Sequence, residues 1–381
     1  MLRIFIQKSF WLYLVIVVLV LSIFSFAQFG PSSTSKIKGL KVALVNEDQG
    51  PNGKVIKEKL QDAFDKSDAP IKWVSRSSLH SAKKGMENKD YYAAVIIPKN
   101  FTEQLLTLQT AKPETAKLEL WVNQGMNAQA ATAIQTIFAK VSNRISAAFS
   151  DQTLQAAEAH HLKLSPAQAN VLAQPMTTET HLINKVGTHS AGGNAPVLLT
   201  MLVWLGGLTS SLLMWRTFKK MGNDSLSLRL TISQTLAGLV LAFAQALTLL
   251  TVVSGMMNLH VPDTSNLIWA LTFSAFVYYL IQTAVLNWLG FKGWPIVILI
   301  WFFGSPLLPY PPEMLNHFFR YWIHSWVPVR FGMETIKDVL YFGAKADLWT
   351  MASILGYIGI GALILVLGAG WWQGRKKLKS V

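Results

Sequence analysis

The residues that come nearest to forming a catalytic or metal site lie in the polar part of the chain, between residues 30 and 195. Glu47-Asp48 and His160-His161 are the two pairs whose carboxylate or imidazole groups could bind a metal ion. Neither pair has a third ligand at a recognisable spacing. Acidic residues after a short apolar run usually form a turn, and the histidine pair ends a stretch of helical composition. We therefore expect structural roles for both pairs and predict no metal site.

Phosphate-binding and nucleophilic chemistry are equally poorly supported. Gly53-Lys54 matches the glycine and lysine that end a phosphate-binding loop, but that motif needs Gly at position 48 and Ser or Thr at position 55, where this chain has Asp48 and Val55. The chain contains no cysteine, which excludes disulfides, thiolate metal sites and cysteine nucleophiles. No Ser-His-Asp signature is present. We expect no catalytic residue and no cofactor bound by this chain, so a membrane enzyme is the least favoured function.

The composition is that of a membrane protein. Of 381 residues, 51% are hydrophobic and only 14% are charged, whereas a soluble domain carries about 25% charged residues. The net charge of +14 could indicate nucleic-acid binding. However, lysine and arginine beside apolar runs mark the cytoplasmic side of a membrane, so we expect membrane lipid and not nucleic acid around this chain. A cysteine-free outer domain would also suit a Gram-positive cell envelope.

A first membrane span is predicted from Ser9 to Phe29, after a short cytoplasmic tail of residues 1–8 that carries Arg3 and Lys8. A cleaved signal peptide is the alternative. Its apolar core would be unusually long, and Ala27-Gln28-Phe29 lacks a small-x-small cleavage site, so we favour an uncleaved anchor.

The polar region, residues 30–195, is expected to be an extracytoplasmic α/β domain inserted between the first and second spans. It begins with a short flexible stalk over residues 30–35. Strand-like runs then alternate with helix-like runs, and this pattern is typical of a small α/β sheet. The expected strands are 41–45, 71–74, 92–97 and 118–122, and the expected helices are 55–64, 79–88, 101–108 and a long one from 128 to about 162.

The C-terminal part of the chain, residues 196–372, is predicted to form a five-helix block, which gives a multi-pass α-helical protein with six transmembrane helices. Basic residues follow the second span and fill the tail 373–381, and Lys292 lies in the short turn between the fourth and fifth spans. The turn 255–266 has Asp263 and no lysine or arginine. This distribution predicts both termini in the cytoplasm of a cell that carries the protein in its plasma membrane. The expected spans are 196–215, 230–253, 267–289, 294–310 and 349–372.

Two segments of this block have a distinct face. In the third span, small and polar residues recur every three or four positions, which suits either close helix packing or the wall of a substrate path. The segment 311–348 follows a proline-rich break and is amphipathic, so a re-entrant hairpin at the outer interface is expected, with a second short helix over residues 333–342. The recurring residues of the third span are Gln234, Gly238, Ala242, Gln245 and Thr248. The expected apolar face of the re-entrant helix consists of Leu315, Phe318, Phe319, Trp322, Ile323 and Trp326, opposite Asn316, Arg320 and His324.

No charged residue falls in the middle of any expected span. Ion-driven transporters usually need an ionisable group at that depth, and the chain has no nucleotide-binding motif. A protein of this kind that moves a substrate uphill would take its energy from another subunit.

Two stretches resemble the outer domain of the YhgE/Pip proteins, which belong with the type-2 ABC transporter permeases. They are Lys41-Val-Ala-Leu-Val-Asn-Glu-Asp-Gln-Gly50 and Tyr91-Tyr-Ala-Ala-Val-Ile-Ile-Pro-Lys-Asn-Phe101. The resemblance covers nearly the whole chain, and it implies the membrane subunit of an exporter that moves a lipid-like, peptide or drug substrate outward. The partners implied are a second permease subunit, identical or different, and a cytoplasmic ABC ATPase that binds ATP and Mg²⁺.

In that family the loop after the second span receives the ATPase, which assigns this role here to Arg216, Phe218, Lys219, Lys220 and Arg229. Some relatives are phage-infection proteins or accompany secretion systems. The alternative function is therefore a cell-surface receptor or secretion scaffold whose outer domain binds a partner, although the outer domain here is short for that role.

Overall fold

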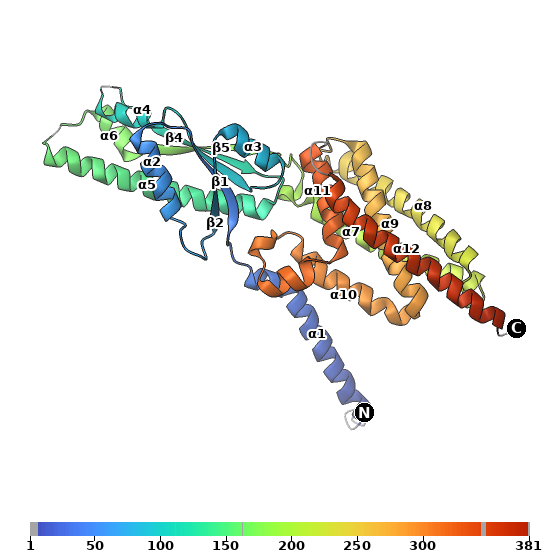
Figure 1. The fold of residues 1–381 in the computed structure, drawn as a ribbon. Coiled ribbons are helices and arrows are strands. Elements are labelled where there is room, and N and C mark those ends of the chain that lie inside the picture. The colour runs from blue at the N-terminus through green and yellow to red at the C-terminus, as the bar shows by residue number, and fades with distance from the viewer. Residues whose placement is uncertain (1–6, 111, 162, 344–347, 380–381) are drawn as a thin grey trace. The chain divides into compact units, whose positions relative to one another are not determined.

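The computed structural model describes residues 7–110, 112–161, 163–343 and 348–379, and divides the chain into two compact units (Figure 1). Residues 36–186 form the sheet unit. Residues 1–35 and 187–381 form the helical unit. Parts of the expected tails (1–6 and 380–381) and of the expected re-entrant segment (344–347) lie outside the described residues.

The sheet unit is built on a five-stranded mixed sheet with the order β2-β1-β3-β4-β5. Strand β4 is antiparallel to β3, and the other neighbouring pairs are parallel. Strands lie at all four stretches where alternation predicted them. The fifth strand was not expected, because its sequence Met-Thr-Thr-Glu-Thr-His-Leu-Ile has little apolar alternation. The strands are β1 (Leu40–Asn46), β2 (Ile71–Arg76), β3 (Ala93–Ile97), β4 (Ala116–Asn123) and β5 (Met176–Ile183).

Helices cover both faces of this sheet. Helix α3 packs its Ala82 and Met86 on alternate residues of β1 and β3, in a cluster that contains Val45 and Ile96. Helix α5 lies alongside β5, and serine side chains of α5 bond to that strand. The α6 helix was not expected, and α5 ends at Ala159. The helices of this unit are α2 (Pro51–Asp62), α3 (Leu79–Glu87), α4 (Phe101–Leu106), α5 (Ala128–Ala159) and α6 (Pro166–Ala173).

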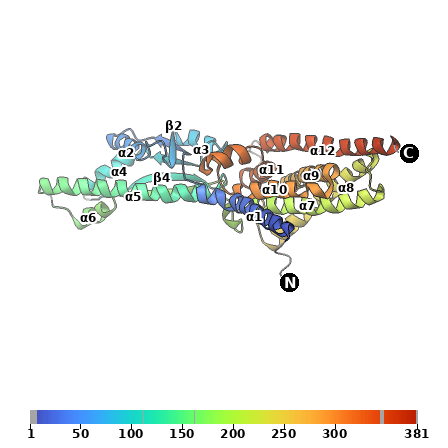
Figure 2. The same cartoon turned by 90° about the horizontal axis from the view of Figure 1, so that it is seen from below.

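The helical unit contains five stretches that are long and apolar enough to cross a membrane: Lys8–Thr34, Ala195–Met221, Leu228–Met256, Thr264–Leu307 and Thr350–Lys376. Helices α7, α8, α9 and α12 run side by side (Figure 2), and the stretch Thr264–Leu307, which begins with α9, is the most buried of the five. The helices of this unit are α1 (Lys8–Thr34), α7 (Ala195–Met221), α8 (Leu228–Leu250), α9 (Thr264–Leu289), α10 (Trp294–Gly304), α11 (Pro328–Lys337) and α12 (Leu348–Lys379).

In the stretch expected to be the fifth of six spans, a short 3-10 helix (Ser305–Leu307) follows the 11-residue helix α10. At about 1.5 Å per residue α10 covers roughly 16 Å, about half of a bilayer core. Gly290, with a φ of 61°, separates it from α9, a conformation that glycine adopts without a side-chain clash. Five candidate spans are therefore present in the described residues, and a sixth crossing is not shown.

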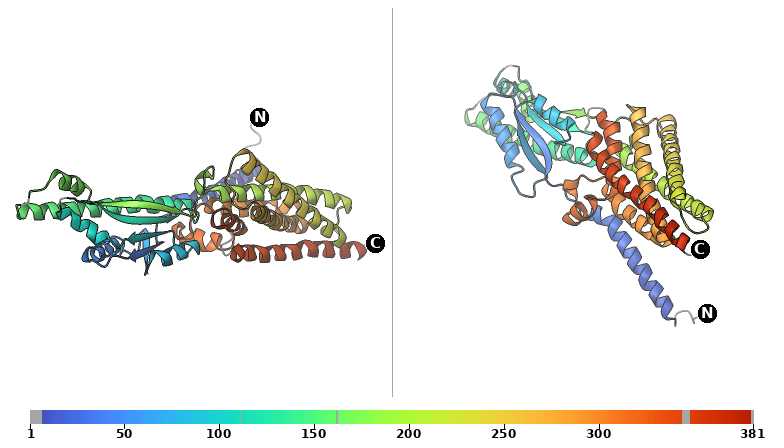
Figure 3. Two further views of the ribbon diagram at one scale, coloured as in Figure 1. Left: turned by 90° about the horizontal axis from the view of Figure 1, so that it is seen from above. Right: turned by 45° about the vertical axis from the view of Figure 1, so that its right-hand side comes forward.

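Helix α1 contacts the rest of its unit through its C-terminal part. Phe24 stacks on Phe302 of α10 with ring centroids 4.3 Å apart, and Gln28 Nε2 donates to the Phe302 carbonyl at 3.1 Å. The apolar side chains from Trp11 to Leu21 are exposed, and Figure 3 shows the helix diverging from its neighbours.

The flexible stalk expected at residues 30–35 is wrong, because helix α1 continues to Thr34. The Thr34 hydroxyl donates to the Gly30 carbonyl at 2.6 Å, and the Ser35 amide donates to the Pro31 carbonyl at 2.9 Å. These local bonds close a last helical turn over a sequence whose glycine, proline and serines predicted a loop.

Candidate functional site

The basic residues expected in a loop after the second span lie mostly in the last turns of α7. This helix runs to Met221, six residues beyond the expected end at Trp215, because lysine and arginine are good helix formers and are favoured at a helix C-terminus. Arg216, Lys219 and Lys220 follow the i, i+3, i+4 spacing that places side chains on one helix face.

This basic face lines a hollow of about 360 Å³ at the end of α7, which we call the α7 hollow. The other lining residues are Trp215, Asn223 and Asp224. Asp224 Oδ1 lies 3.8 Å from Lys219 Nζ, but its side chain is 90% exposed, so this ion pair is weak. Three cations against one solvated carboxylate leave the α7 hollow positively charged.

The turn that closes the α7 hollow has an unusual backbone. Asn223 and Asp224 both have a positive φ, 51° and 63°, a conformation that Asn and Asp tolerate better than other residues with a Cβ. Their amides donate to the carbonyls of Lys220 and Lys219 at 3.2 and 3.0 Å. The turn therefore folds back over the helix end and brings Asp224 beside Lys219.

Gln373 of α12 fixes this turn to two other helices. Its Oε1 accepts from the Leu226 amide at 3.1 Å, and its Nε2 donates to the Asn287 carbonyl of α9 at 2.8 Å. Ser227 then caps α8 by accepting from the Leu230 amide. Gln373 was not among the predicted site residues, because it contacts the turn only in three dimensions.

The two remaining residues predicted for ATPase contact lie apart from the α7 hollow. Phe218 is buried, with 8% of its surface exposed. Arg229 is exposed, but it is the second residue of α8 and does not line the hollow.

The polar face predicted on the third span lies largely against α7 and α9. Gln234 is fully buried: it exchanges side-chain hydrogen bonds with Asn287 and accepts a bond from the Tyr279 hydroxyl at its carbonyl, at 2.9 Å. Gly238 faces the same tyrosine, and a Cβ added there would come within 1.9 Å of the ring.

Farther along α8, Ala242 is buried, and Gln245 Nε2 donates to the carbonyls of Leu202 and Val203 in α7 at 3.1 and 3.0 Å. Thr248 is exposed and bonds only within its own helix. Neighbouring helices therefore fill the space beside most of this face within one copy. The partner residues Asn287 and Tyr279 could have been suspected from their spacing of eight along the expected fourth span.

The residues predicted for one face of the re-entrant helix lie on two sides of this segment in the structure. Phe319 is buried with Leu307 and Leu315, and its ring lies against Gly30 of α1. Phe318, Trp322 and Trp326 are 41%, 67% and 50% exposed. The physical reason is that residues 318–324 form a π-helix, η8, whose wider turn changes the direction of successive side chains from that of an α-helix.

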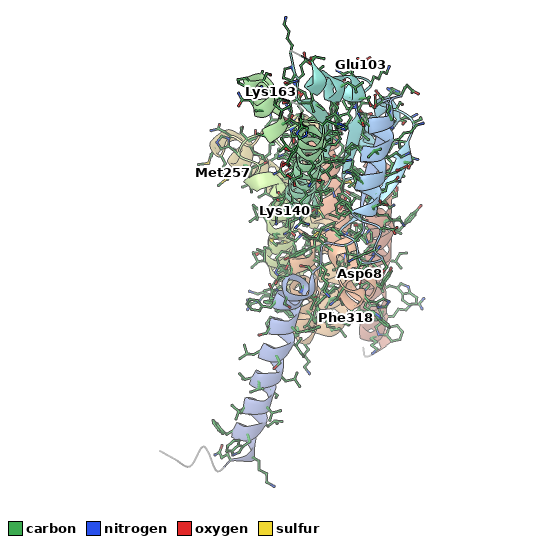
Figure 4. All side chains as sticks on the ribbon, turned by 90° about the vertical axis from the view of Figure 1, so that its left-hand side faces the viewer. Asp68, Glu103, Lys140, Lys163, Met257 and Phe318 are labelled. Atoms are coloured by element: carbon green, nitrogen blue, oxygen red, sulfur yellow. The ribbon has the colours of Figure 1, made fainter. Side chains whose placement is uncertain are left out.

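Figure 4 shows Phe318 beside the C-terminal part of α1, where its ring centroid lies 5.8 Å from that of Phe26. His324, expected on the polar side of the same segment, is buried instead. Burial, followed by the charge of Arg330, lowers the pKa of His324 to about 3. The imidazole is therefore neutral at physiological pH.

A cluster of charged residues around His324 was missed by the sequence analysis. Arg330 Nη1 donates to the His324 carbonyl at 3.0 Å, and Lys337 Nζ lies 2.6 Å from a Glu334 carboxylate oxygen. Burial lowers the pKa of Arg330, and Asp338 is fully buried. These residues belong to α11 and the π-helix η9 (Asp338–Phe342), outside the five candidate spans.

The carboxylates of Glu47 and Asp48 cap helices, in agreement with the structural roles expected of them. Glu47 Oε1 accepts from the Leu79 amide at 2.9 Å, and Asp48 Oδ2 accepts from the Gly53 amide at 3.0 Å and from the Thr102 hydroxyl. The described residues contain no group of three or more His, Asp or Glu side chains that could hold a metal ion.

Comparison with known proteins gives one family and one structural similarity. The family model described as "Protein of unknown function (DUF3533)" matches residues 12–362. No curated protein matches the chain. Among solved structures, the chain is similar to the crystal structure of a domain of a candidate ABC type-2 transporter from Thermotoga maritima MSB8. The identity is 21% and the TM-score 0.25, over 37% of this chain and 86% of that one.

Proposed function

Because the chain belongs to the DUF3533 family of proteins of unknown function, its role must be argued from its own residues, and we propose that it is the membrane permease subunit of an ABC-type exporter. ATP and Mg²⁺ are bound by a separate cytoplasmic ATPase, and this chain binds no cofactor. The α7 hollow is the observation that carries the proposal. The resemblance of residues 41–50 and 91–101 to the YhgE/Pip proteins supports the same assignment.

The charge of the α7 hollow suits a docking site for an acidic protein surface. Arg216, Lys219 and Lys220 line it together, and complementary charge guides association and orientation between protein partners. The positive-inside rule assigns this end of the helices to the cytoplasm, where the ATPase is found. The ATPase therefore contacts Lys219 and Lys220 directly.

A chain of hydrogen bonds connects the docking site to the interior of the helical unit. The turn is bonded through Leu226 to Gln373, Gln373 is bonded to Asn287, and Asn287 is bonded to Gln234. A displacement of the turn when the ATPase closes on ATP thus acts on α9 and α12 as well as on α7 and α8. This connection transmits the energy of ATP hydrolysis to the membrane helices.

The substrate leaves between two permease subunits and not through one of them, since neighbouring helices fill the polar face of α8 within a single copy. The second subunit is identical or different, and the substrate is a lipid-like molecule, a peptide or a drug. Six crossings with both termini in the cytoplasm of a plasma membrane are part of the same proposal. The proposal also includes a re-entrant hairpin over residues 311–348 at the outer interface, and it places the sheet unit outside the membrane.

The proposal is tested by isolating the tagged protein from its own membranes in mild detergent, identifying co-purified proteins by mass spectrometry and measuring ATP hydrolysis. A stoichiometric ATPase subunit with turnover supports the permease. A pure preparation of folded protein that lacks an ATPase and carries envelope or secretion proteins would contradict it.

A receptor or secretion scaffold is the second candidate, and the separate compactness of the sheet unit favours it. Such a unit could bind a partner while the helices only anchor it. Deletion of residues 36–185 distinguishes the two functions. Loss of partner binding with retained ATPase association supports a permease with an accessory domain, whereas a protein that never associates with an ATPase supports the scaffold.

A further inference from the structure

The sheet unit has a free strand edge with a defined set of unpaired backbone groups. In the parallel pair of β4 and β5, the carbonyls of Pro175 and Ile183 accept bonds from the β4 side, from the amides of Ala116 and Gln124 at 2.9 and 3.1 Å. Backbone groups alternate in direction along a strand. Odd-numbered residues of β5 therefore face β4, and even-numbered residues face away from the sheet.

Among the outward residues of β5, only Met176 has its backbone groups bonded within the unit, while the Thr178 hydroxyl bonds to Ser142 Oγ of α5 at 2.8 Å. The Met176 amide donates to Ser146 Oγ of α5 at 3.3 Å, and the same hydroxyl donates to the Met176 carbonyl at 3.2 Å. No backbone bond among the described residues reaches the outward groups of Thr178, Thr180 and Leu182. Thr180 is exposed at the centre of this edge.

The two edges of the sheet differ in how they are protected. Strand β2, at the opposite edge, carries exposed Lys72 and Arg76, and charged side chains of this kind prevent pairing with another strand. Strand β5 has no lysine, arginine or proline between residues 176 and 183. The β5 edge is thus open to pairing with a further strand, whereas the β2 edge is guarded.

We propose that β5 pairs with β5 of a second copy of this chain, antiparallel and with a two-fold axis at Thr180. In this register the outward residues 178, 180 and 182 face the partner subunit's residues 182, 180 and 178, so every outward group of the free edge is bonded. Each Glu179 lies opposite the partner subunit's His181, whose imidazole N–H can donate a hydrogen bond to the carboxylate across the strand pair. The sheet then continues through both copies.

Neighbouring registers are less favourable on the same residues. An axis at Glu179 places two carboxylates directly opposite each other, which destabilises a strand pair. An axis at His181 leaves Thr178 without a partner. The register at Thr180 is therefore specific and can be tested at single residues. It follows from the strand edge alone and does not depend on the transport proposal.

The absence of cysteine from the chain allows a direct test in the full-length protein in membranes. Directly opposite Cα atoms in a hydrogen-bonded antiparallel pair are about 5.5 Å apart, within the range of roughly 4.4–6.8 Å that a disulfide needs. Thr180→Cys is expected to form a disulfide-linked dimer under mild oxidation. Ser75→Cys, exposed on the β2 edge, is the matched control and should cross-link about tenfold less, since its thiols meet only by collision.

Three further variants test the pairing without cross-linking, with mass photometry as the readout. Thr180→Pro removes only an outward amide, so the β4–β5 ladder is kept, and the dimer fraction should fall. Glu179→Lys should also lower the dimer fraction, and the swapped variant Glu179→Lys/His181→Glu should restore it. Equal cross-linking at positions 75 and 180 would overturn the proposal. So would an accessible thiol at position 180 that links to another protein or to nothing. A dimer fraction unaffected by Thr180→Pro would overturn it as well.

Discussion

The side-chain amides of Gln234 in α8 and Asn287 in α9 bond to each other in both directions. Asn287 Nδ2 donates to Gln234 Oε1 at 3.0 Å, and Gln234 Nε2 lies 3.5 Å from Asn287 Oδ1. Both residues are buried between two candidate membrane spans. A reciprocal pair of this kind satisfies polar groups that could not find water in a bilayer.

Replacement of one member of this pair should cost more than replacement of both. Gln234→Leu or Asn287→Leu leaves the other amide unpaired, and bonds of this kind in membrane helices contribute about 0.6 to 2 kcal/mol. The double variant should therefore be more stable than the sum of the single effects predicts. Thermal unfolding in detergent measures this, with Thr248→Val on the exposed side as the control. Strict additivity would contradict a direct coupling of the two amides.

The glycines of the long helices should differ sharply in their tolerance of alanine. A Cβ at Gly238 would come within 1.9 Å of the Tyr279 ring, whereas a Cβ at Gly361 in α12 has no atom within 4 Å. Gly238→Ala should destabilise the protein by about 1–3 kcal/mol through overpacking. Gly361→Ala should be neutral or slightly stabilising. The comparison uses the midpoint of thermal unfolding, and similar midpoints for the two variants would show that α8 and α9 are not so closely packed.

The sequence predicts those parts of the fold whose signal is local. Short strand-like runs predicted β1, β2, β3 and β4, and the long apolar runs predicted α1, α7, α8, α9 and α12. Strand β5 was missed because threonine, glutamate and histidine occupy most of it, so only its pairing with β4 makes it a strand. Its outward side has no buried partner to impose an apolar pattern.

The candidate site is less predictable, because its contacts join distant parts of the chain. The positive charge at the end of α7 is evident from the sequence. The contact of Gln373 with the turn is not, because Gln373 belongs to α12, far away in the chain. Phe318 and Phe319 were expected on the same helix face, but they lie on different sides of the segment. Nothing in a single sequence indicates the π-helix that these residues form. His324 was assigned to a polar face for the same reason.

Acid should destabilise the protein partly through His324. Burial lowers the pKa of this imidazole to about 3 in the folded state, against about 6.5 in the unfolded chain. The unfolded state therefore binds more protons between these values. The contribution to stability is complete above about pH 6.5 and is lost as the pH falls toward 3, by at most about 1.4 kcal/mol per pH unit.

The variant His324→Gln should show a smaller loss of stability between pH 6.5 and 4 than the unchanged protein. The exposed His161 provides the matched control, and His161→Gln should leave the slope unchanged. Unfolding midpoints over this pH range measure both slopes. Parallel slopes for all three proteins would exclude a buried neutral imidazole at position 324.

The number of crossings determines on which side the termini lie. Six crossings place both termini in the cytoplasm, whereas five place them on opposite sides. Single cysteines introduced at Ser9 and Gln373, labelled in intact cells with a membrane-impermeant reagent, should both remain unlabelled until the membrane is opened. A cysteine at Asn258, in the turn after α8, should be labelled in intact cells. Labelling of only one terminal position would show that α10 and the residues after it do not complete a crossing.

The cations of the α7 hollow should be required for association with the ATPase. Lys219→Glu/Lys220→Glu reverses the charge of the hollow, and the variant should lose co-purified ATPase and ATP hydrolysis while keeping its unfolding midpoint, because both side chains are partly or fully exposed. The matched control is Arg375→Glu/Lys376→Glu at the end of α12. There the cations lie 4.0 and 5.2 Å over the rings of Trp371 and Trp372 and do not line the hollow.

The two double variants change the net charge equally at basic helix ends, so a general effect of charge on membrane orientation would affect both. Selective loss in the α7 variant supports docking at the hollow. Equal loss of ATPase association in both variants would indicate a changed membrane orientation and not a lost contact with the ATPase. Full ATPase association in the α7 variant would contradict the proposed site. Because a docking surface acts through its cations, Lys219→Arg/Lys220→Arg should retain association.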